Sequence, residues 1–83
     1  MMATLAHFDY FSSVVTITER YLGPASERFI RRQIEFHLEK APEDISYQDV
    51  KKLKDNVGVA LGLLVNDKKL VSQAVSDIDS IPE

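Results

Sequence analysis

His37 is the side chain of this sequence whose type and position best suit chemistry at neutral pH. An imidazole titrates near pH 7, so His37 could act as a catalytic base or as a pH-sensitive group. It lies one helical turn after Gln33, between two apolar edges of one expected helix. That position favours a structural histidine, hydrogen-bonded to a neighbour at a buried or half-buried polar seam, over a catalytic one.

Other constellations that could perform chemistry are incomplete. His7 and Asp9 could hold a metal ion, but the sequence offers no further ligands to complete such a site. There is no cysteine, the three glycines are isolated from one another, and no serine has the glycine context of a hydrolase nucleophile. We therefore expect a protein that is not an enzyme, with no catalytic residue, no metal and no cofactor.

Arg28, Arg31 and Arg32 are the best candidates for contact with phosphate or nucleic acid. They share one face of the same expected helix with Glu35 and Glu39, and Arg31 and Glu35 have the spacing of a helical ion pair worth about 0.3 kcal/mol. The net charge of −3 also argues against nucleic acid as the main partner. We favour a solvated helix face. The alternative is a small nucleic-acid-binding regulatory protein that uses these arginines.

Length and composition indicate one small domain. A chain of 83 residues with 45% hydrophobic content can bury a single core, and domains of this size often gain stability by oligomerising. No signal peptide is apparent, and the apolar run over 57–65 is far shorter than the roughly 20 residues that span a bilayer. We expect one helical domain over 1–83, ordered over about 8–79, in a cytoplasmic protein without a membrane partner.

Apolar residues recur at the helical spacing along the chain, which predicts an all-α fold. The expected helices cover about 9–22, 24–40, 46–65 and 67–78. Gly23-Pro24 should end the first helix and begin the second, because glycine suits the position after a helix and proline the first turn of the next. The prediction is a small four-helix, bundle-like domain.

Two polar signals mark the boundaries of the later helices. Ser46 and Asp49 have the spacing of a capping box, which should begin the third helix. Asn66 is the expected break before the fourth helix and could cap it. The alternative is that the third and fourth helices are merged into one long helix through Asn66.

The third expected helix carries apolar residues on more than one face. Its core stripe comprises Val50, Leu53, Val57, Ala60, Leu61 and Leu64. Val59 and Leu63 point away from that stripe, and Gly58 and Gly62 form a smooth groove that another backbone could approach. Either this helix is the centre of a monomer, with its glycines making room for the first or second helix, or its C-terminal half packs against another chain. We favour the second interpretation.

The second helix has a wide apolar arc that suggests contact with two neighbours, and Phe36 lies on one edge of it. We predict an interface formed by Phe36, His37, Gly58, Val59, Gly62 and Leu63. The partner would be a second copy, giving a homodimer, or a different protein.

The residues Tyr21-Leu22-Gly23-Pro24-Ala25, followed by Phe29 to Arg32, resemble a known family. It is a small all-helical domain with a Leu-Gly-Pro helix junction, found at the C-terminal ends of bacterial signalling proteins such as Ser/Thr protein kinases. The resemblance covers about Val15 to Ile78. It implies a non-catalytic helical interaction or assembly module in bacterial signalling or regulation, with no catalytic residues to transfer.

Overall fold

A computed structural model describes residues 9–82, and within that range the chain forms helices and turns but no strand. The α-helices are α2 (Tyr10–Leu22), α3 (Ser26–His37), α4 (Tyr47–Leu64) and α5 (Lys68–Asp79), and the 3₁₀ turns are η1 (Gly23–Ala25) and η2 (Pro42–Asp44). The all-α prediction is confirmed. None of the helices in this range has both the length and the apolar character needed to cross a bilayer.

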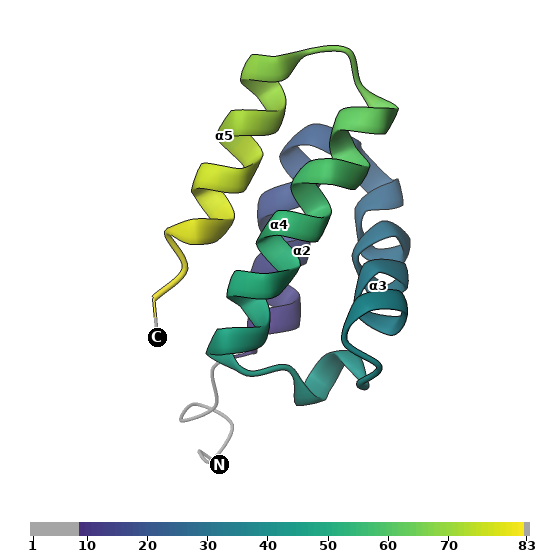
Figure 1. The fold of residues 1–83 in the computed structure, drawn as a ribbon, viewed down its shortest axis with the longest axis vertical. Helices are drawn as coiled ribbons and strands as arrows, with labels where there is room; N and C mark the ends of the chain where they lie inside the picture. The colour runs from purple at the N-terminus through teal and green to yellow at the C-terminus, as the bar shows by residue number, and fades with distance from the viewer. Residues whose placement is uncertain (1–8, 83) are drawn as a thin grey trace.

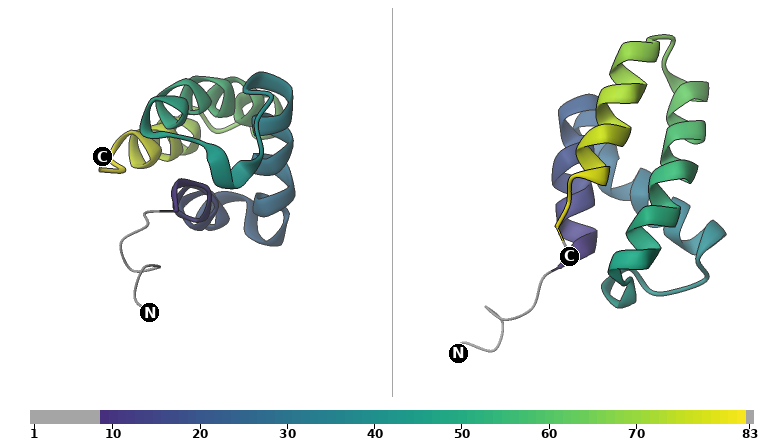
Figure 2. Two further views of the ribbon diagram at one scale, coloured as in Figure 1. Left: turned by 90° about the horizontal axis from the view of Figure 1, so that it is seen from below. Right: turned by 60° about the vertical axis from the view of Figure 1, so that its left-hand side comes forward.

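Along the long axis of the molecule the helices point alternately in opposite directions, with α3 strongly inclined to that axis (Figures 1 and 2). Helices α4 and α5 form an antiparallel hairpin, and α3 lies on the other side of α4 from α5. Helix α2 lies behind α4 and packs against both α3 and α5. The core therefore lies between the inner faces of all these helices.

The junction between α2 and α3 follows the predicted chemistry, with a small difference in where α3 starts. Gly23 ends α2 with φ = 62°, in the region that glycine adopts without steric cost. Pro24 then belongs to the 3₁₀ turn η1, so α3 begins at Ser26 and not at Pro24. Helix α3 also ends at His37, before the predicted 39–40, because the chain takes a positive φ of 54° at Glu39.

The predicted capping box begins α4. The Asp49 backbone N–H donates to Ser46 Oγ at 3.2 Å, and the Ser46 backbone N–H donates to Asp49 Oδ2 at 2.9 Å. Helices α4 and α5 are separate, so the merged alternative is wrong. The cap of α5 is Asp67 and not Asn66, because Asp67 Oδ1 accepts hydrogen bonds from the backbone N–H groups of Lys69 and Leu70.

Fully buried aliphatic side chains from every helix form the core. They are Val14, Ile30, Ile34, Val50, Leu53, Val57, Leu61, Ala74 and Ile78. Four of the six residues predicted for the α4 stripe are among them, whereas Ala60 is half-buried and Leu64 is exposed.

A pair of buried hydroxyl groups joins α2 to α3, and the sequence reasoning did not foresee it. Thr18 Oγ1 donates to the Val14 carbonyl at 2.9 Å, and Ser26 Oγ donates to the Val15 carbonyl at 3.0 Å. The two hydroxyl oxygens also lie within hydrogen-bonding distance of each other, and because each hydroxyl has a single hydrogen, the group that donates in this pair gives up its bond to the carbonyl. Both residues are fully buried, so these bonds remove the cost of placing polar groups in the core.

Candidate functional site

The α4–α5 hairpin extends past the turn that joins α2 to α3, as Figures 1 and 2 both show. The last turn of α4 therefore has no helix from the other pair against its inner side. Leu64 lies in this turn and is 62% exposed, although its spacing from Leu61 places it on the core stripe. The helical repeat identified the direction of this side chain correctly, but no neighbouring element reaches far enough to cover it.

Val59 and Leu63 are exposed on the outer side of α4. Their exposed fractions are 69% and 84%, which agrees with the prediction that they point away from the core. Neither residue is covered by another part of the described chain, so α4 is not enclosed on all sides at this end. Together with the hollow described next, they form a surface that we call the apolar face.

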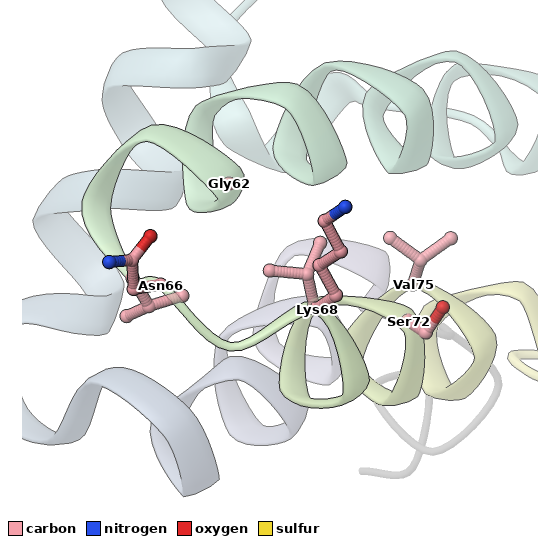
Figure 3. A pocket seen from close by; sticks show the side chains of 7 residues that line it. Gly62, Asn66, Lys68, Ser72 and Val75 are labelled. Carbon is pink, nitrogen blue, oxygen red and sulfur yellow. The ribbon is translucent and has the colours of Figure 1, made fainter.

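A hollow of about 410 Å³ lies between the end of α4 and the start of α5 (Figure 3). It is lined by Gly62, Val65, Asn66, Lys68, Val71, Ser72 and Val75. In Figure 3 the α4 side carries Gly62, the α5 side carries Lys68, Ser72 and Val75, and Asn66 lies in the connection. The lining of the hollow is mainly apolar, with the polar side chains of Asn66 and Lys68 near the α4–α5 connection and that of Ser72 beside Val75 on α5.

The two glycines of α4 have different surroundings, which corrects the prediction that they form one groove for another backbone. A Cβ atom placed on Gly58 would lie 3.0 Å from Cγ2 of Val75, so Gly58 allows α4 and α5 of the same chain to approach closely. A Cβ atom on Gly62 would meet nothing within 4 Å. Gly62 alone presents open backbone. The helix for which Gly58 makes room is α5, and not the first or second helix.

Phe36 and His37 do not join the apolar face. Both are exposed in the last turn of α3, with Phe36 exposed by 73%. Helices α3 and α4 run in opposite directions, so the end of α3 and the end of α4 lie at opposite ends of the molecule (Figure 1). The predicted six-residue interface is therefore split, and the expected buried or half-buried position of His37 is wrong.

The three arginines of α3 have different roles. Arg31 donates to Glu27 Oε2 at 3.0 Å, and its guanidinium lies 5.1 Å from the centre of the Phe11 ring. The predicted partner, Glu35, is not the one used. Arg28 and Arg32 are exposed, have no ion pair with any residue in 9–82, and flank a shallow hollow beside Phe29.

Several titratable groups with displaced pKa values lie at contacts between helices. The hydrogen bond from the Tyr21 hydroxyl to Asp77 Oδ2, at 2.6 Å, raises the pKa of Tyr21 and lowers that of Asp77. Hydrogen bonds from Lys51 and Lys54, at 2.8 and 3.1 Å, lower the pKa of Asp79. These groups join α5 to α2 and α4, which is a structural use of their charge.

Metal-ligating side chains do not gather in the described part of the chain, where no group of three or more His, Cys, Asp or Glu side chains could hold an ion. Asp9, one half of the predicted weak metal pair, caps α2 by accepting from the Ser12 backbone N–H. His7, the other half, lies outside the described residues.

Comparisons with protein-family models, with curated proteins and with solved structures found no match. The resemblance to the Leu-Gly-Pro domain family therefore stays a prediction.

Proposed function

We propose that the protein is a non-catalytic helical interaction module that assembles through the apolar face. The observation that carries the proposal is the exposure of Val59 and Leu63 on α4 beside an apolar hollow. Fully burying a side chain of this kind contributes about 1.5–3 kcal/mol, and apolar patches on small domains tend to be interfaces. The preferred partner is a second copy, because two identical apolar faces can cover each other.

The setting of this activity is also a proposal. The module would be a small four-helix, bundle-like domain in the cytoplasm. It would act in bacterial signalling or regulation and would carry no catalytic groups. The Leu22-Gly23-Pro24 junction supports it, because the family that it resembles carries the same junction between its helices. Phe36 and His37, at the other end of the molecule, are available to a further protein partner.

Sedimentation equilibrium over a wide concentration range tests the proposal. We expect a wild-type dimer, and folded monomers for both Leu63→Asp and Leu63→Lys, because either charge would have to be buried in the interface. Only the aspartate variant places a negative charge at the C-terminus of the helix, where it is unfavourable. Loss of the dimer in both variants therefore reports loss of the interface.

Gln48→Asp is the matched control, since Gln48 is an exposed residue at the opposite end of α4. It should dimerise as the wild type does, and circular dichroism should show all variants folded. A wild type that stays monomeric at every concentration would contradict self-assembly.

Nucleic-acid binding is the second candidate, and the free guanidinium groups of Arg28 and Arg32 are the observation that favours it. A gel shift with duplex and single-stranded DNA at low salt, on the wild type and on Arg28→Gln/Arg32→Gln, tests it. Binding that requires both arginines and weakens as salt is added would support this function. The interaction module predicts no shift for either protein.

A further inference from the structure

The apolar face carries both a ridge and a hollow. Asp55, Val59 and Leu63 follow one another at intervals of four residues, so their side chains form one exposed row along α4. The hollow beside this row has Gly62 on one side and Val71 and Val75 on the other. In a twofold dimer each copy presents the same surface, so the ridge of one copy can enter the hollow of the other.

The charges at the two ends of this surface decide between the two orientations of the partner helix. Lys68 lies at the start of α5, near the end of the hollow formed by the α4–α5 connection, and Asp55 lies one turn before Val59. Both are exposed and neither has an ion pair within residues 9–82. If two α4 helices run antiparallel with Val59 in the partner's hollow, Asp55 lies over the end that carries Lys68.

In a parallel arrangement the other end of the row, which carries Leu63 and no acidic side chain, would lie toward Lys68. The acidic group that follows this end along the chain is Asp67, whose Oδ1 already accepts from the Lys69 and Leu70 backbone N–H groups of its own helix at 3.0 and 3.2 Å. The antiparallel arrangement instead pairs two groups that have no other partner. Charge complementarity therefore favours the antiparallel dimer.

We infer that a second copy docks antiparallel on the apolar face, with Val59 of each copy in the hollow of the other and Asp55 of each copy beside Lys68 of the other. This inference rests on the proposed function. It adds the orientation of the two copies and the residues that make the pairing specific.

Reversing one charge at a time tests the arrangement. Asp55→Lys places two lysines together at both ends of the interface, and Lys68→Asp places two aspartates together. We expect each variant to dimerise about tenfold more weakly than the wild type, because two attractive contacts become two repulsive ones.

An equimolar mixture of the two variants should form a heterodimer with close to wild-type affinity, because both of its contacts are again between opposite charges. Sedimentation equilibrium gives the affinities, and native mass spectrometry separates the heterodimer from the two homodimers. Lys69→Asp and Asp44→Lys are matched controls. They make the same charge changes at exposed positions outside the ridge and hollow, and should leave dimerisation unchanged.

The outcomes separate this inference from the proposed function. If Leu63→Asp abolishes the dimer but the charge variants neither weaken it nor select a heterodimer, the apolar face is an interface with a different arrangement, and the inference is overturned alone. If the wild type does not dimerise, both are overturned. If each single variant weakens dimerisation and the mixture recovers close to wild-type affinity, the inference and the proposed function are both supported.

Discussion

At the scale of single residues, the environment and not the residue type decides what a position does. Gly58 and Gly62 are four residues apart in the same helix, and the sequence makes them equivalent. In the structure Gly58 faces Val75 of α5 across a close contact, while Gly62 faces the open hollow. The first glycine is needed for the fold of one chain, and the second leaves a surface available to another.

Alanine substitutions should distinguish these two roles. Gly62→Ala is expected to raise the free energy of unfolding by about 1 kcal/mol, the difference in helix propensity between glycine and alanine, because the added methyl group meets no atom. Gly58→Ala should gain less than this or lose stability, because its methyl group must displace Val75. Urea unfolding, at a protein concentration low enough to keep the chain monomeric, measures the stability change in each variant. Equal gains for the two variants would show that the Val75 contact imposes no cost.

At the scale of elements, one carboxylate organises the start of α4. Asp49 is buried and accepts from Lys40 Nζ at 2.6 Å as well as from the Ser46 backbone N–H. Burial by itself raises the pKa of Asp49, but the hydrogen bonds from Lys40 and Ser46 outweigh it and hold the pKa below its ordinary value of 3.8. The cap, the salt bridge and the chain that enters α4 therefore depend on one ionised group.

The stability should follow the ionisation of this group. The pKa of Asp49 is lower in the folded than in the unfolded state, so its contribution is complete above about pH 4 and is lost as the pH falls through the folded pKa. The lowered pKa values of Asp77 and Asp79 act in the same direction. We expect the free energy of unfolding to be constant from about pH 5 to 7 and to fall below pH 4.

Asp49→Asn should cost about 1–2 kcal/mol at pH 7, because it removes the charge that Lys40 and the cap require. The difference from the wild type should shrink as the pH falls through the folded-state pKa of Asp49, where the wild-type carboxylate also becomes protonated. Denaturant unfolding across this pH range measures it, with the exposed Asp44→Asn as the control. A difference that stays constant with pH would show that the ionised form of Asp49 is not what stabilises α4.

At the scale of the whole molecule, the α4–α5 hairpin extends beyond the turn that joins α2 to α3. The core closes below the tip of the hairpin, and Leu63 and Leu64 remain exposed there (Figure 1). A small domain gains only a narrow margin of stability from its own core. Covering the tip with a partner would add to that margin, so assembly and stability should be linked.

This linkage predicts a melting temperature that depends on protein concentration. For the wild type we expect a rise of about 5 °C over a hundredfold increase in concentration, because a dimer is favoured by mass action and the unfolded chain is not. Leu63→Lys should melt at a temperature independent of concentration, while Gln48→Asp should follow the wild type. Calorimetry or thermal circular dichroism measures this. A wild-type melting temperature that does not change would contradict the linkage.

The sequence alone determined the features that depend on neighbours along the chain. The helical repeat identified every described helix, Gly23 marked the end of α2, and Ser46 with Asp49 marked the start of α4, because helix periodicity and caps act within a few residues. The outward direction of Val59 and Leu63 followed from the same repeat.

Only the tertiary structure decided which residues face one another. Leu64 is exposed because the α2–α3 turn does not reach far enough to cover it. Gly58 makes a close contact because α5 lies against it. Phe36 and Leu63 are far apart because α3 and α4 run in opposite directions. Arg31 forms its ion pair with Glu27 and not with Glu35, and its guanidinium lies over the Phe11 ring of α2. A periodic pattern gives the direction of a side chain but not the length or position of the element opposite it, and these set burial and contact.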